Sequence, residues 1–313
     1  MIEPSDLLLG GLLPAVAAAV VLAFVWKFTR HAGAAWSASL TVGYLAGHWA
    51  LDANTAGFLS AVAKSFNPHE ARDWLPLAIL LSSIPCAVAL AGKKGRVIAW
   101  LLRAVLCVFL PWRLLVGSAY LPSVSLSKVA FDTGAWSTPE SVAWLSGIST
   151  ALFTAWLFAE AENRGSVCRL RASLATLVAL SGAVVLAMSG SFTYGQLLGV
   201  LTATLAGSSL IAIILRLDRG PESAAGPLVA VFGGALVLGH FFSELRLLNA
   251  CLLLLAMAVA IGWMPPKLSQ RMQVSLRCLL CLIPLTIAVT LAAMEFSATQ
   301  VELESNPYLN FRQ

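Results

Sequence analysis

Charge is what this sequence has least of, since only 11% of its 313 residues are Asp, Glu, Lys or Arg, against 59% hydrophobic residues. Soluble domains carry about 25% charged residues. A chain with less than half that share cannot cover a water-facing surface, and the mean hydropathy of +0.84 agrees. The 20 Lys and Arg are scattered rather than gathered in a basic domain, which excludes a nucleic-acid reader. The composition predicts an integral membrane protein whose main partner is the lipid bilayer.

Catalytic motifs are also missing from the sequence. It contains no Gly-rich phosphate loop, no Ser/His/Asp array and no zinc-protease His pair. Cys278 and Cys281 have redox or metal spacing, but they lie in an apolar run without a neighbouring His or acid, which favours simple packing. We therefore expect no cofactor, and a membrane-embedded enzyme is the least favoured class.

The N-terminus lacks the positive charge that a secretory signal needs. Glu3 and Asp6 precede the first apolar run, 7–26, whereas Lys27 and Arg30 follow it. The run is long enough to span a bilayer, and positive charge after it predicts that this end faces the cytoplasm. We expect a retained first span with its N-terminus outside.

Apolar runs of spanning length recur along the whole chain. They predict an all-α, polytopic transmembrane helical bundle of about ten spans: 7–26, 32–51, 74–92, 97–116, 141–159, 172–190, 196–215, 227–243, 247–264 and 274–293. With the N-terminus outside, the inner loops hold roughly twice as many Lys and Arg as the outer segments. An even number of spans also returns the C-terminus to the outside. We predict one domain, 1–313, in the cytoplasmic (inner) membrane, with both termini extracytoplasmic.

The pair of spans 227–243 and 247–264 has an alternative, because only Glu244, Leu245 and Arg246 separate the two runs. A re-entrant hairpin fits the same sequence. The choice between two spans and a hairpin stays open at this point.

Two extramembrane segments carry further expectations. In the outer loop 52–73, apolar side chains fall on one helical face and predict a short helix lying on the membrane surface. These are Phe58, Leu59, Val62 and Phe66. The C-terminal tail, Glu295–Gln313, is polar, and we expect it to be loosely ordered outside the membrane.

Small residues at a spacing of four predict close helix packing. One such series is Gly43 and Gly47 in the second span, and the other is Gly195, Gly199, Ala203 and Gly207 in the seventh. Such ridges let a neighbouring backbone approach, so we interpret them as helix–helix contacts rather than ligand sites.

Arg103 falls within a predicted span, six residues after its start at position 97. Two interpretations fit this position. The side chain either extends to the headgroup region or contacts an anion or substrate in a cavity that faces the cytoplasm.

Histidine shows the most unusual pattern in the sequence, since three His residues precede an acid by four positions. The pairs are His48 with Asp52, His69 with Asp73, and His240 with Glu244. On a helix each pair shares a face, and a carboxylate beside an imidazole favours its protonated form or orients it as a metal ligand. The hypothesis is an outward-facing proton or metal site. The alternative is that such residues simply concentrate at span ends. With Arg103, His48 and His240 are the candidate substrate-binding residues.

A short stretch resembles the middle of the drug/metabolite transporter superfamily. It comprises Gly182–Met188, the run Tyr194–Leu201 and Arg216. The resemblance implies a small carrier. Members of that family are expected to keep both termini inside and to show an internal repeat, whereas this sequence predicts both termini outside and shows no repeat. We therefore assign no family and transfer no residues.

Two functions remain. The favoured one is a small secondary carrier or permease, because short loops and prolines within spans are compatible with a transporter. Few acids fall at mid-membrane, which favours a neutral or amphipathic solute over cation coupling. The alternative is a non-catalytic structural or assembly subunit of a larger membrane complex, with membrane protein partners or further copies of this chain.

Overall fold

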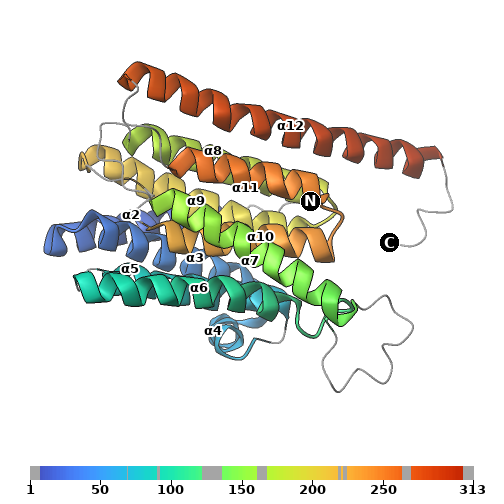
Figure 1. Ribbon diagram of the computed structural model, residues 1–313, viewed down its shortest axis with the longest axis horizontal. Helices are drawn as coiled ribbons and strands as arrows, with labels where there is room; N and C mark the ends of the chain where they lie inside the picture. The colour runs from blue at the N-terminus through green and yellow to red at the C-terminus, as the bar shows by residue number, and fades with distance from the viewer. Residues whose placement is uncertain are drawn as a thin grey trace.

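Helices make up nearly all of the computed structural model, which describes residues 8–68, 70–89, 92–121, 136–160, 168–217, 220, 224–262 and 269–305. In chain order they are η1 (Leu8–Leu12), α2 (Leu13–Thr29), α3 (Ala32–Ala56), α4 (Phe58–Phe66), η2 (Ala71–Asp73), α5 (Trp74–Val88), α6 (Lys93–Leu115), α7 (Thr138–Glu160), α8 (Cys168–Met188), α9 (Phe192–Ile214), α10 (Ala225–Phe242), α11 (Leu247–Ile261) and α12 (Gln270–Ser305). The long helices run along one common direction (Figure 1), as expected for a transmembrane bundle.

Within these described ranges, eight helices are long and apolar enough to cross a membrane. They are η1 with α2, η2 with α5, and α6, α7, α8, α9, α10 and α12. The other two predicted spans also fall on helices, α3 and α11. Helix α11 has 15 residues, or about 22 Å at 1.5 Å per residue, against a hydrocarbon core of about 30 Å. The all-helical fold is confirmed and its long apolar helices are compatible with a multi-pass membrane protein, whereas the count of ten spans stays a prediction.

Helix α10 forms the centre of the bundle. Within its most apolar stretch, 89% of the residues are buried inside the protein. Its glycines allow this, because a methyl group at Gly233 would overlap Leu152 of α7, and one at Gly239 would overlap Leu186 of α8. Helix α11 packs beside α10 as a separate helix that contacts α7, α8 and α12.

The N-terminal helices α2 and α3 pack against α9 through small and hydroxylated residues. An added Cβ at Gly43 would lie 2.7 Å from Ala18 Cβ, and one at Gly47 would lie 2.5 Å from a Val200 methyl. Ser39 Oγ donates to the Ala18 carbonyl at 2.7 Å and lies 2.6 Å from Ser208 Oγ. Close approach and interhelical hydrogen bonds together hold these helices in a setting where lipid offers no hydrophobic drive for association.

The small residues of α9 have different neighbours along the helix. A methyl group at Gly195 would meet the Ala183 carbonyl on α8 at 2.9 Å, whereas one at Gly207 would overlap the α2 backbone. Gly199 has nothing within 4 Å of its added Cβ, and Ala203 is half-buried. The ridge therefore changes partner, because a spacing of four residues drifts around a helix with 3.6 residues per turn.

The short helix expected in the outer loop is present as α4. Leu59 is 83% exposed and Phe66 67% exposed. The opposite side of α4 is hydrogen-bonded to α3, because Trp49 Nε1 of α3 donates to Ser65 Oγ at 2.8 Å. The axis of α4 crosses the direction of the long helices (Figure 1). An apolar face left open on such a helix is the arrangement of a membrane-surface segment.

The expectation of a loosely ordered tail from Glu295 was wrong for its first part, because α12 continues as a helix to Ser305. No Gly or Pro interrupts this stretch, and the next proline is Pro307. Arg246, before α11, also pairs with Glu295 at 2.8 Å. Helical propensity thus carries the chain beyond the predicted span boundary.

Arg277 of α12 ties that helix to the end of α11. The side chain is 2% exposed, and its Nη1 donates to the carbonyls of Val259 at 3.1 Å and Ala260 at 3.0 Å. The last carbonyls of a helix lack partners within it and carry partial negative charge. Arg277 supplies both the donor and the positive charge.

Replacing Arg277 with methionine is expected to lower the free energy of unfolding by about 2 kcal/mol, because two carbonyls lose a charged donor. Arg271→Met, an exposed position on the same helix, serves as the control and should change stability by less than about 0.5 kcal/mol. Thermal melting in detergent compares the two variants. Equal melting temperatures would contradict this role of Arg277.

Candidate functional site

Arg103 and Glu160 form an ion pair inside the bundle. Arg103 Nη1 of α6 lies 2.5 Å from Glu160 Oε2 at the end of α7, and the two side chains are 7% and 22% exposed. The guanidinium therefore lies within the protein rather than at the lipid surface. Glu160 lies one residue beyond the predicted span 141–159, but α7 continues through it. Each charge satisfies the other, which is how ionised groups persist at membrane depth.

Aromatic rings enclose this ion pair. Arg103 Cζ lies 6.0 Å from the ring centroid of Trp100 and 5.8 Å from that of Trp156. Trp156 also donates from Nε1 to Glu160 Oε1 at 3.0 Å. Arg103 Nε is buried without a hydrogen-bond partner in the part of the chain that the structure describes. The indole of Trp156 thus contacts both charges at once.

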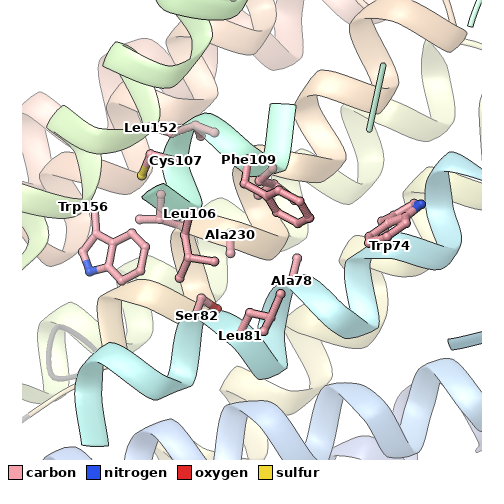
Figure 2. A pocket seen from close by; sticks show the side chains of 12 residues that line it. Trp74, Ala78, Leu81, Ser82, Leu106, Cys107, Phe109, Leu152, Trp156 and Ala230 are labelled. Atoms are coloured by element: carbon pink, nitrogen blue, oxygen red, sulfur yellow. The ribbon is translucent and has the colours of Figure 1, made fainter. Parts of the chain in front are cut away.

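The other side of Trp156 faces an apolar cavity between α5, α6, α7 and α10 (Figure 2). Its empty volume is about 430 Å³, part of it open to the outside. Two of the residues that line it, Ser82 and Cys107, carry a hydroxyl or thiol group. The others are apolar or aromatic and include Trp74, Ala78, Leu81, Leu106, Phe109, Leu110, Leu152, Val229 and Ala230.

Gly226 of α10 positions Trp156 at this cavity. An added Cβ at Gly226 would overlap Trp156 and would lie 2.5 Å from the Ser82 carbonyl. Only glycine lets α10 approach α5 and α7 closely enough to hold the indole between the cavity and the ion pair.

A second cavity, the His240 pocket, lies between α7, α10 and α11 and has about 490 Å³ of empty space. Its residues are apolar except for His240 and Cys251. His240 Nδ1 lies 2.8 Å from the Leu245 carbonyl. Leu152 lines both cavities.

His48 and Asp52 are brought together as the spacing predicted. His48 Nε2 lies 3.7 Å from Asp52 Oδ2. One turn earlier on α3, the Tyr44 ring stacks on the imidazole with centroids 6.0 Å apart. Tyr44 Oη and His48 Nδ1 are buried without hydrogen-bond partners among the described residues. Arg72 and Asp73 lie near enough to act on His48 electrostatically. The outward-facing proton site stays a prediction that this column of side chains supports.

The other two His–acid pairs have different surroundings. Helix α10 ends at Phe242, so Glu244 lies beyond it and does not share a helical face with His240. His69 lies outside the described residues, and Asp73 accepts a hydrogen bond from the Glu70 amide at 3.1 Å. Within the described ranges, no three His, Cys, Asp or Glu residues are grouped as they would be around a metal ion.

Sequence reasoning singled out Arg103 but missed Glu160 and Trp156 as its partners. A signal was available, because an Arg within a span needs a counter-charge, and Glu160 directly follows an apolar run on the same predicted side. The cavity itself left no such signal, since ordinary apolar residues from four helices form it.

Known proteins offer no guide to this site. No family model, curated protein or solved structure matches the chain. The function therefore has to be argued from geometry and chemistry.

Proposed function

We propose that this multi-pass membrane protein is a small carrier for a neutral, amphipathic solute. The observation that carries the proposal is the apolar cavity between α5, α6, α7 and α10, which adjoins a buried ion pair. The apolar wall would hold the body of the solute. The Ser82 hydroxyl donates to the Ile79 carbonyl at 3.1 Å, and its oxygen would accept a hydrogen bond from the head group.

Neutrality of the solute follows from the charges beside the cavity. Arg103 is paired with Glu160, so the nearest charges cancel and leave no net attraction for an ion. An anionic solute would have to displace Glu160 from the guanidinium. A cationic solute would be repelled by Arg103 as soon as it drew Glu160 away.

A path for the solute is supported by the position of Leu152. This side chain is 3% exposed and lines both the cavity and the His240 pocket. We propose that a rotamer change at Leu152 helps to join the two spaces along α10. Alternating access requires such a step between two sides of a binding site.

A flip assay in reconstituted vesicles tests the proposal. The probe is an octyl glucoside with an NBD group on its tail, which is neutral and amphipathic, and dithionite bleaches only the probe exposed outside. With the wild-type protein, the protected inner probe should become bleachable several-fold faster than in protein-free vesicles. Ala230→Leu, which fills the cavity, should return the rate to the protein-free value.

The control is Ala206→Leu, the same change at an exposed position of α9, and it should keep the wild-type rate. A wild-type rate equal to that of empty vesicles would contradict the carrier. If the protein also co-purified in fixed stoichiometry with other membrane proteins, the subunit alternative would replace it.

A further inference from the structure

The His240 pocket contains one hydrogen-bonding nitrogen whose role can be assigned. A carbonyl oxygen only accepts hydrogen bonds, so the contact of 2.8 Å between His240 Nδ1 and the Leu245 carbonyl requires a proton on Nδ1. In the neutral ring, Nε2 is then an acceptor. Among the described residues, the hydrogen bond shown for this ring is the one at Nδ1, to the Leu245 carbonyl.

Aromatic neighbours hold this imidazole in place. Its centroid lies 4.7 Å from that of Phe241 and 6.0 Å from that of Trp144. Trp144 in turn stacks on Trp136 with centroids 5.8 Å apart. The ring is therefore fixed by its bond to Leu245 and by packing, as a preorganised binding group is.

The rest of the pocket is apolar and opens to the outside of the bundle. Leu247 is 46% exposed, and Cys251 is also exposed at the rim. In a membrane protein this outer surface faces lipid, so molecules dissolved in the bilayer reach the pocket directly. The empty space between its walls, part of it open to the outside, is about 490 Å³.

We infer that the His240 pocket binds an apolar, bilayer-dissolved molecule that carries one hydroxyl group, with the hydroxyl donating to His240 Nε2. A saturated hydrocarbon would leave Nε2 unpaired, and a carboxylate would place a negative oxygen against an acceptor. A long-chain alcohol satisfies both the nitrogen and the apolar walls. This binding needs no transport and therefore does not rest on the proposed carrier function.

Quenching of tryptophan by brominated probes tests the inference in the full-length protein in lipid nanodiscs. The probes are 12-bromododecan-1-ol and 1-bromododecane, which differ in the hydroxyl group. The contribution of Trp144 is the difference between wild type and Trp144→Phe. We expect the alcohol to reach half-saturation at a bilayer mole fraction about five- to tenfold lower than the bromoalkane, the effect of one hydrogen bond.

His240→Asn is the matched variant. Its side-chain amide nitrogen can take the position of Nδ1 and keep the bond to Leu245, but nothing replaces Nε2. The alcohol curve should then shift onto the bromoalkane curve, with an unchanged melting temperature. Identical curves for both probes on the wild type, or a preference that survives in His240→Asn, would overturn the inference.

A second measurement on the wild type needs no substitution at His240. Dodecan-1-ol should slow the reaction of Cys251 with N-ethylmaleimide, followed by peptide mass spectrometry, more than dodecane does at the same mole fraction. Stronger protection by dodecanoate than by the alcohol would show that Nε2 donates, which would overturn the proposed ligand class. The flip assay can fail without changing either binding result, so the two proposals are tested separately.

Discussion

Replacing Glu160 with glutamine is expected to lower the free energy of unfolding by about 3–5 kcal/mol, as loss of one partner of a buried ion pair does. Glutamine keeps the size of the side chain and an oxygen that accepts from Trp156 Nε1. What is lost is the charge that compensates Arg103, whose side chain is 7% exposed. Unfolding by SDS or heat in mixed micelles measures the difference.

The control for this change is Glu295→Gln. Glu295 also pairs with an arginine at 2.8 Å, but that partner, Arg246, is 67% exposed. Exposed pairs contribute about 1 kcal/mol or less. The double variant Arg103→Met with Glu160→Gln should recover a large part of the stability lost in Glu160→Gln alone, because no unpaired charge is left. Additive losses in the double variant would show that the two residues do not act as a pair.

Replacing Gly207 with alanine is expected to cost about 3 kcal/mol, at the upper end of the range for overpacking. The added methyl group would overlap the backbone of Ala15 in α2. A backbone cannot rotate away as a side chain does, so α2 and α9 would have to separate, and the bond between Ser39 and Ser208 lies in the same region.

Gly199→Ala provides the matched comparison on the same helix, since nothing lies within 4 Å of its added Cβ. There the methyl group should leave stability unchanged or raise it by up to about 1 kcal/mol through helix propensity. A melting temperature for Gly207→Ala as high as that of Gly199→Ala would contradict the close contact of α2 with α9.

Hydropathy predicted most of the architecture. Each predicted span overlaps a helix, from 7–26 on η1 and α2 to 274–293 on α12. The predicted boundaries were less accurate where a helix continues into polar sequence. Helix α12 extends to Ser305, although charged residues reappear at Glu295. Hydropathy describes where lipid can surround a helix, whereas the hydrogen-bonded backbone continues until a breaker or a turn ends it.

The candidate site was only partly predictable. The spacing of His48 and Asp52 was enough to predict that the two side chains lie close together, because both belong to α3. The same spacing failed to describe His240 and Glu244, because α10 ends between them and the imidazole bonds to Leu245 instead. Local spacing predicts contacts only while the helix that it assumes continues.

By itself, the sequence determined where the helices run, and its 11% of charged residues and recurrent apolar runs are those of a chain suited to a bilayer. Tertiary structure alone decided which helix is central, which acid neutralises Arg103 and where the two cavities lie. The physical reason is that a helix forms from bonds between near neighbours in the chain. Cavities and ion pairs instead depend on side chains from separate helices, and their relative rotation and depth are set by packing.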